Sequence, residues 1–150
     1  MAYTIMQVIN QEANTAKLEI FVDHVLARTH LFAAGNITIE GNITELSFTV
    51  ADLQVATSLI LNWLADIYIK LQPPVVLPNI FSTKIKHKNN GKIEKIIEVN
   101  VDIFSAEWDD ATDLITVPIM PGTFVMSFWS YNELVLSFNQ FIRYIELYSV

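Results

Sequence analysis

The pattern of apolar and polar positions predicts one long helix with particular clarity. Between residues 50 and 71, polar side chains recur at every fourth position and nearly all other positions are apolar. These polar residues are Gln54, Ser58, Asn62, Asp66 and Lys70. Thr49 stands at the expected N-cap with Asp52 three residues later, as in a capping box, and Pro73-Pro74 ends the pattern. A helix with so narrow a polar stripe packs across a sheet or is half covered by a partner, for which the simplest candidate is a second copy.

Two further segments have helical spacing. Residues 132–148 place Leu134, Phe138 and Ile145 on one face and predict a second long helix. Residues 17–32 fit two patterns, because apolar residues recur at helical spacing and Leu18, Ile20 and Val22 also alternate. We favour a helix for this segment, with Gly35 following its C-terminus.

The remaining periodic segments predict strands. Asn89-Asn90-Gly91 separates two lysine-rich runs and is typical of a tight turn, so residues 84–101 form a long hairpin. Residues 36–49 read as two strands with a turn at Gly41-Asn42. Residues 114–129 read as two strands joined at Pro121-Gly122, and residues 105–113 as an acidic loop.

These elements predict a single α+β domain over residues 1–150. We expect a mostly antiparallel sheet with two long helices, about 50–71 and 132–148, packed on one face. The sequence lacks the regular alternation of strands and helices that a doubly wound parallel sheet requires.

Composition narrows the functional classes. The chain has no cysteine, which excludes disulfides, cysteine-bound metals and thiol nucleophiles. A formal net charge of −7 argues against general nucleic-acid binding. The longest uncharged runs are short or interrupted by proline, so we expect no membrane span. The absence of a basic, apolar leader favours a cytoplasmic location.

Charge is concentrated in two segments. Residues 84–95 carry a local charge of +4 on an otherwise acidic chain, with Lys84, Lys86, Lys88 and Lys92 at the expected hairpin tip. This tip could contact a phosphate, an acidic partner or the chain's own acidic loop, although lysines on an edge strand also serve simply to prevent aggregation.

The acidic loop contains the second concentration of charge, with Glu107, Asp109, Asp110 and Asp113 around Trp108. Its carboxylates could steer a basic protein toward Trp108 as an anchor. The simpler reading is a solvated loop whose tryptophan covers the core. The loop lacks the glycine and the terminal glutamate of an EF-hand, so we expect no metal.

No nucleophile elbow, phosphate-binding loop, dinucleotide motif or zinc-protease motif is present, and we expect neither enzymatic activity nor a cofactor. Size, acidity and the missing motifs favour a binding protein that inhibits or neutralises a macromolecule, in the manner of an immunity protein or antitoxin. Its protein partner would be basic, such as a toxin or nuclease.

Two other functions remain open. The first is a carrier of a lipid or another hydrophobic molecule, with a cavity between sheet and helix lined by aromatic side chains: Phe124, Phe128, Trp129, Phe138 and Phe141. The second is a subunit of a homo-oligomer, with a homodimer formed through the 50–71 helix.

Overall fold

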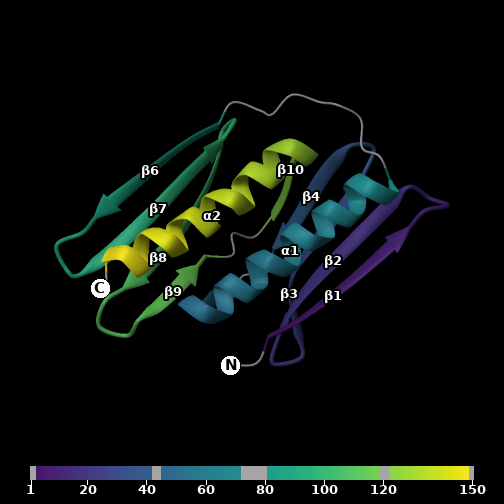
Figure 1. Cartoon of the computed structure of the whole chain (residues 1–150). Helices are drawn as coiled ribbons and strands as arrows, with labels where there is room; N and C mark the ends of the chain where they lie inside the picture. The colour runs from purple at the N-terminus through teal and green to yellow at the C-terminus, as the bar shows by residue number, and fades with distance from the viewer. Residues whose placement is uncertain (1–2, 42–44, 72–80, 119–121, 149–150) are drawn as a thin grey trace.

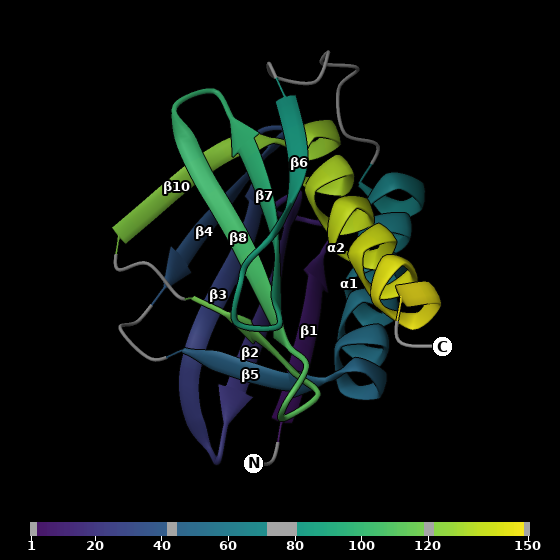
Figure 2. The same ribbon diagram turned by 90° about the vertical axis from the view of Figure 1, so that its left-hand side faces the viewer.

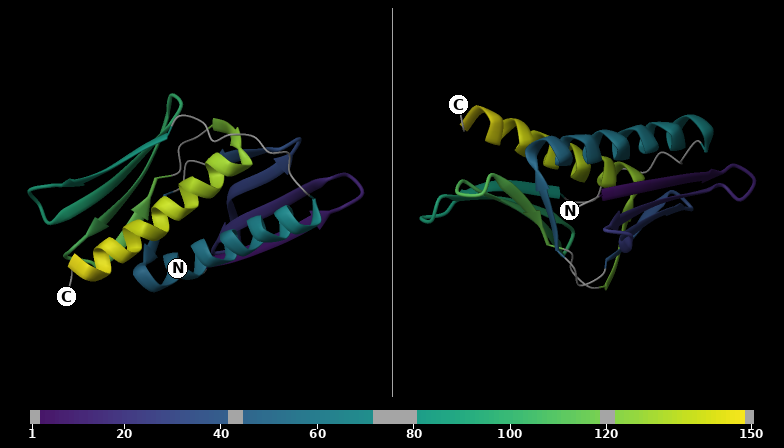
Figure 3. Two further views of the ribbon diagram at one scale, coloured as in Figure 1. Left: turned by 45° about the horizontal axis from the view of Figure 1, so that its top comes forward. Right: turned by 90° about the horizontal axis from the view of Figure 1, so that it is seen from below.

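Two five-stranded antiparallel sheets and two long helices form the fold of the computed structural model (Figure 1), which describes residues 3–41, 45–71, 81–118 and 122–148. Sheet A has the strand order β1-β2-β3-β4-β10, and sheet B the order β5-β9-β8-β7-β6. The sheets form a V whose open side is closed by both helices (Figure 3). The predicted α+β class is confirmed, with two sheets in place of one.

The first half of the chain contains five strands followed by a helix. Their bounds are β1 Tyr3–Asn10, β2 Thr15–Val22, β3 Val25–Ala33, β4 Asn36–Gly41, β5 Leu46–Thr49 and α1 Val50–Lys70. The second half repeats this order. Its elements are β6 Phe81–His87, β7 Lys92–Val99, β8 Asp102–Asp109, β9 Leu114–Val117, β10 Gly122–Ser127 and α2 Phe128–Tyr148.

The two halves exchange their fifth strands. β5 leaves the strands of its own half and pairs with β9 in sheet B, while β10 pairs with β4 in sheet A. Each sheet therefore consists of four consecutive strands from one half and one strand from the other. The halves are consequently a structural repeat that shares one core.

Equivalent residues of the two helices confirm this repeat. The Thr49 hydroxyl accepts a hydrogen bond from the Asp52 N–H (3.1 Å), and Ser127 accepts one from the Ser130 N–H (3.2 Å) at the equivalent turn. The core-facing positions also correspond in order: Leu53 and Tyr131, Ala56 and Leu134, Thr57 and Val135, Ile60 and Phe138, Trp63 and Phe141, Leu64 and Ile142, Ile67 and Ile145.

The core fills the space between the V and the helices, which lie side by side (Figure 2). The largest fully buried side chains come from both sheets and both helices, and include Trp63, Trp108, Tyr131, Phe32 and Phe141. Burying such side chains contributes about 1.5–3 kcal/mol each and holds the two halves together.

The helix expected over residues 17–32 is wrong, because this segment forms β2 and β3. Asp23 and His24 make the tight turn between them with positive φ angles of 49° and 67°. Aspartate and histidine tolerate this left-handed region better than most residues. Leu18, Ile20 and Val22 are buried, so the alternating pattern corresponds to the structure and the helical spacing does not.

The strands expected within residues 36–49 and 114–129 exist, but they do not form local hairpins. β4 pairs with β3 and β10, whereas β5 pairs with β9. The segments joining β4 to β5 and β9 to β10 thus carry the chain from one sheet to the other. The proposed turn positions at Asn42 and Pro121 lie outside the described residues.

The helix predicted over 50–71 is confirmed as α1, whereas α2 begins at Phe128, earlier than predicted. The exposed side of α1 is wider than its polar stripe, because four large apolar side chains also lie there: Val55, Leu59, Tyr68 and Ile69. By length and composition alone α1 could also cross a membrane, but its other side packs in the core. The hairpin of β6 and β7 is confirmed, with Gly91 at a φ of +77°.

The N-cap of α1 makes a testable contribution to stability. We expect Thr49→Ala to lower the free energy of unfolding by about 1 kcal/mol, since the N–H of Asp52 loses its acceptor. Urea unfolding followed by circular dichroism measures this change. Ser58→Ala, on the exposed side of the same helix, is the control and should not lower the free energy of unfolding, because alanine has the higher helix propensity. Equal losses in both variants would contradict the capping role.

Candidate functional site

The segment expected to be an acidic loop is mostly strand. β8 extends to Asp109, and Trp108 is 2% exposed beneath the C-terminal end of α2, where its ring meets that of Tyr148. Its indole N–H donates to the Asp113 carboxylate (2.8 Å). Trp108 therefore covers the core, and the prediction of an exposed tryptophan anchor is wrong.

The acidic residues of this segment also have hydrogen-bond partners within the chain, through their side chains or their backbone. Alternation along β8 places Glu107 and Asp109 on the face opposite Trp108. Asp109 accepts a hydrogen bond from the Ala111 N–H (3.0 Å), and the Asp110 N–H donates to the Gly91 carbonyl (3.1 Å). Since Asp113 holds the indole, these acidic residues do not surround an exposed aromatic side chain.

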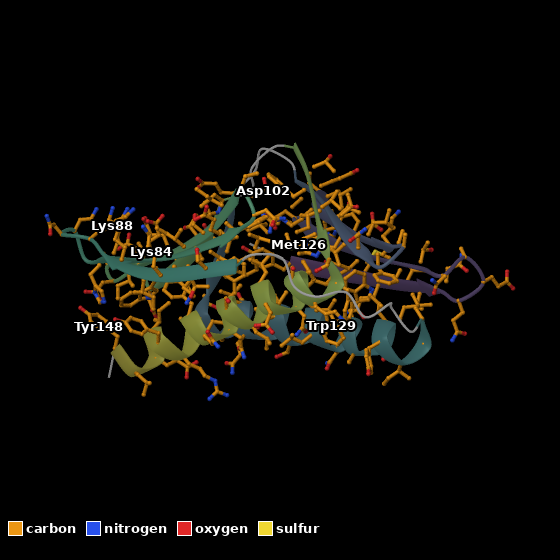
Figure 4. All side chains as sticks on the ribbon, turned by 90° about the horizontal axis from the view of Figure 1, so that it is seen from above. Lys84, Lys88, Asp102, Met126, Trp129 and Tyr148 are labelled. Atoms are coloured by element: carbon orange, nitrogen blue, oxygen red, sulfur yellow. The ribbon has the colours of Figure 1, made fainter. Side chains whose placement is uncertain are left out.

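The basic hairpin contacts this acidic segment. Lys88 lies 2.5 Å from one Glu107 oxygen and 3.9 Å from Glu94, and Lys92 lies 3.6 Å from the other Glu107 oxygen. The hydrogen bond to Glu107 raises the pKa of Lys88. Lys84 (Figure 4) is exposed on β6. Lys86 is exposed on the same strand. From the sequence, the hairpin tip could contact a phosphate, an acidic partner or the chain's own acidic segment. The structure contains the contact with the acidic segment.

A cavity of about 60 Å³ lies at the centre of the molecule, where both sheets and both helices meet. Its lining is mostly apolar and comes from both halves, with Ile60 and Phe138 as equivalent residues on the two helices. Four polar side chains also line it: Arg28 and His30 from β3, Tyr131 from α2, and Thr57 from α1, whose hydroxyl donates to the Gln54 carbonyl. This cavity is the candidate functional site.

The polar groups in the cavity contact one another but retain unused hydrogen-bond donors. The Tyr131 hydroxyl lies 2.5 Å from His30 Nδ1. If the phenol donates in this contact, His30 carries its proton on Nε2. His30 Nε2 and Arg28 Nε are both buried without a hydrogen-bond partner. Among the described residues, the only other buried side-chain nitrogen or oxygen without a hydrogen-bond partner is Trp63 Nε1.

Burial determines the protonation of this cluster. Desolvation, with a smaller contribution from the neighbouring guanidinium, holds the pKa of His30 well below its usual value. Desolvation raises the pKa of Tyr131 and lowers the pKa of Arg28. At neutral pH the cluster therefore consists of a neutral imidazole, a neutral phenol and a guanidinium, because arginine keeps its proton in proteins even where burial lowers its pKa.

The internal repeat shows that the fold itself does not require this cluster. β3 pairs Arg28 with Ile20 and His30 with Leu18, and β8 pairs Phe104 with Ile97 and Ala106 with Lys95 at the equivalent positions. Leu53 is the equivalent of Tyr131. The positions equivalent to Arg28 and His30 are thus Phe104 and Ala106 in the second half, and the position equivalent to Tyr131 is Leu53 in the first. The buried polar side chains of the second half include Lys95, which stands in place of Leu18, and desolvation lowers the pKa of that amine.

A second cavity, of about 40 Å³, continues from the first along Arg28 into the seam between the sheets. Gly41, Ser105 and Phe124 are among its lining residues, and the Arg28 guanidinium donates to the Pro118 carbonyl there (3.3 Å). No carboxylate pairs with Arg28 within the described part of the chain. The guanidinium is thus half-buried between the two cavities without a counter-ion from those residues.

Sequence reasoning did not bring Arg28, His30 and Tyr131 together as one site. Arg28 and His30 share a face only in a strand, and the favoured helix for this segment separated them. The signal available in the sequence was the presence of two polar residues, Arg28 and His30, at inward-facing positions where an alternating strand otherwise has apolar residues. In the described residues, no group of three or more histidine, aspartate or glutamate side chains could hold a metal ion.

The low pKa of His30 predicts a loss of stability in mild acid. The folded state resists protonation of His30, so below about pH 6.5 the unfolded state binds more protons and stability falls. Each unit by which the folded pKa lies below 6.5 costs about 1.4 kcal/mol once both states are protonated. Urea unfolding from pH 7.5 to 5 measures this loss, which His30→Gln should reduce. His24→Gln, at an exposed turn, should leave it intact; an unchanged pH dependence in His30→Gln would contradict the assignment.

Comparisons of this chain with protein-family models, with curated proteins and with solved structures find no significant match.

Proposed function

We propose that this chain is a non-enzymatic binding protein that holds a small anionic ligand, of the carboxylate class, in its central cavity. The observation that carries this proposal is the polar cluster of Arg28, His30 and Tyr131 in a core whose equivalent positions are apolar. Burying polar groups without partners is unfavourable, by about 1–3 kcal/mol for each group. A cluster that the fold does not require and that reduces stability is better explained by binding.

The chemistry of the cluster favours an anion. Arg28 Nε–H is a donor, and His30 Nε2 is a second one when the Tyr131 hydroxyl donates to Nδ1. A carboxylate can accept from both donors and neutralise the guanidinium, and hydrogen bonds to charged groups are about twice as strong as neutral ones. A neutral ligand would leave the positive charge uncompensated.

The size of the cavity favours a small ligand. One water molecule needs about 10–15 Å³ in such a cavity, so 60 Å³ accommodates only a few non-hydrogen atoms. The smaller cavity beside Arg28 and Phe104 offers about 40 Å³ more toward the seam. These volumes fit a short-chain carboxylate better than a lipid. Of the aromatic residues expected to line a carrier cavity, Phe138 lines both spaces and Phe124 the smaller one.

The remaining hypotheses stay predictions. Inhibition of a basic protein partner is untested, but the burial of Trp108 removes the anchor on which the docking surface depended. A lipid carrier is likewise untested. Phe128 and Trp129 line a surface groove of about 270 Å³ between the two helices and do not line the central cavity.

Binding of short carboxylates tests the proposal directly. We expect acetate, propionate or butyrate to raise the melting temperature of the protein, whereas the matched primary amides should not. A ligand at 100 times its Kd contributes about 2.7 kcal/mol. Isothermal titration calorimetry measures the same binding at constant temperature.

Two variants locate the binding. Arg28→Met removes the charge in the cavity and should abolish the response to carboxylates. Lys17→Met removes an exposed charge from β2 and is the matched control, which should respond like the wild type. An equal response in both variants, or no binding of any carboxylate to the wild type, would contradict the proposal.

A further inference from the structure

His30 lines the central cavity with one ring nitrogen in contact with Tyr131 and the other without a hydrogen-bond partner. A hydroxyl group both donates and accepts hydrogen bonds, so the contact with Tyr131 persists whether or not His30 Nδ1 carries a proton. An imidazolium donates from both nitrogens, which leaves the N–H of Nε2 for a bound molecule. The site can therefore hold His30 in either protonation state without losing the contact that positions its ring.

The surroundings of His30 contain positive charge but no negative charge. Arg28 lies two residues away on the same face of β3, and the residues paired with His30 on β2 and β4 are the apolar Leu18 and Ile39. The helices line the cavity with apolar residues, one threonine and Tyr131, and β5, β8 and β9 contribute apolar side chains alone. No aspartate or glutamate of the described residues lines either cavity. A positive charge on His30 therefore has no counter-ion among these residues.

A bound carboxylate changes this balance. It compensates the charge of Arg28 and accepts a hydrogen bond from His30 Nε2–H, and an opposite charge at that distance favours the protonated form of a histidine. Burial and the neighbouring guanidinium keep the pKa of His30 well below its ordinary value. The ligand neutralises the second of these effects and adds an attraction, so His30 holds a proton more tightly in the complex.

We propose that a carboxylate enters the cavity together with a proton from solvent, which His30 takes up, so that the site is filled in mild acid and emptied as the pH rises. The proton adds to Nδ1, Tyr131 changes from donor to acceptor, and Nε2–H donates to the carboxylate, which stays ionised. This inference rests on the proposed function and describes the regulation of the same site.

Thermodynamic linkage fixes the direction of the effect. A group that binds its proton more tightly in the complex than in the free protein makes the complex stronger as the pH falls. Between the pKa of His30 in the free protein and its pKa in the complex, the affinity rises by up to tenfold for each pH unit. The ligand should consequently offset the loss of stability that the buried histidine causes in acid.

Calorimetry in two buffers measures the proton uptake directly. Whichever of acetate, propionate and butyrate binds most tightly is titrated into the wild-type protein at pH 6, once in PIPES and once in bis-Tris. These buffers differ in ionisation enthalpy, so an uptake of protons appears as a difference in the observed heat. We also expect the Kd to fall from pH 7.5 to 5.5, a range in which the ligand stays ionised because carboxylic acids titrate at about pH 4–5.

A neutral replacement of His30 identifies the group that takes up the proton. His30→Gln keeps an N–H donor but has no titratable ring. This variant should bind the carboxylate more weakly, with the same Kd at pH 7.5 and 5.5 and with no dependence of the heat on the buffer. His24→Gln, at an exposed turn, is the matched control and should retain the proton uptake. A pH dependence that persists in His30→Gln would place the proton on the ligand and overturn the proposal.

Nuclear magnetic resonance of the wild type gives the same answer without relying on a variant. The ring ¹⁵N shifts of His30 distinguish a neutral imidazole from an imidazolium, and at pH 6 we expect the neutral form without ligand and the imidazolium with saturating carboxylate. A His30 that stays neutral in the complex, or a Kd that is equal at both pH values, overturns this inference and leaves the proposed function intact. Absence of carboxylate binding at every pH overturns both.

Discussion

The exchange of the fifth strands is the constraint on which this structure depends. β5 and β10 each complete the sheet of the other half, and each leads directly into a helix. The N-caps Thr49 and Ser127 end these strands, so the exchange also determines where the helices begin. Each helix begins at the end of a strand in one sheet and covers a core that the other sheet also lines. Neither half of the chain therefore has a complete sheet or a complete core by itself.

The repeat provides an internal comparison for every position. Features needed by the fold recur in both halves, as do the helix caps and the buried positions of α1 and α2. Features that occur once have another cause. The polar residues Arg28 and His30 occur in one half of the core, and an edge strand without charge occurs in one of the two sheets. The proposed function rests on the first of these two departures.

Local signals in the sequence predicted α1 and the β6–β7 hairpin, because a helical period with a cap and an Asn-Gly turn act over a few residues. Long-range pairing was missed, since nothing near β4 and β5 indicates that neighbouring strands join different sheets. Residues 17–32 fit both the helical and the strand period, and they form strands because their alternating apolar side chains pack in the core. The acidic neighbours of Trp108 suggested exposure, but in a strand they face the opposite side from the indole.

The candidate site could not be predicted, because its residues come together only through the fold: Arg28 and His30 from β3, and Tyr131 from the helix of the other half. Its electrostatics are equally a property of the fold. An anion approaches a chain of net charge −7 against the overall field, which salt screens beyond about 8–10 Å. Inside the cavity the lower dielectric strengthens the attraction of the single guanidinium several-fold. Selectivity for an anion therefore depends on Arg28 at short range, while the surface charge slows the entry of the anion.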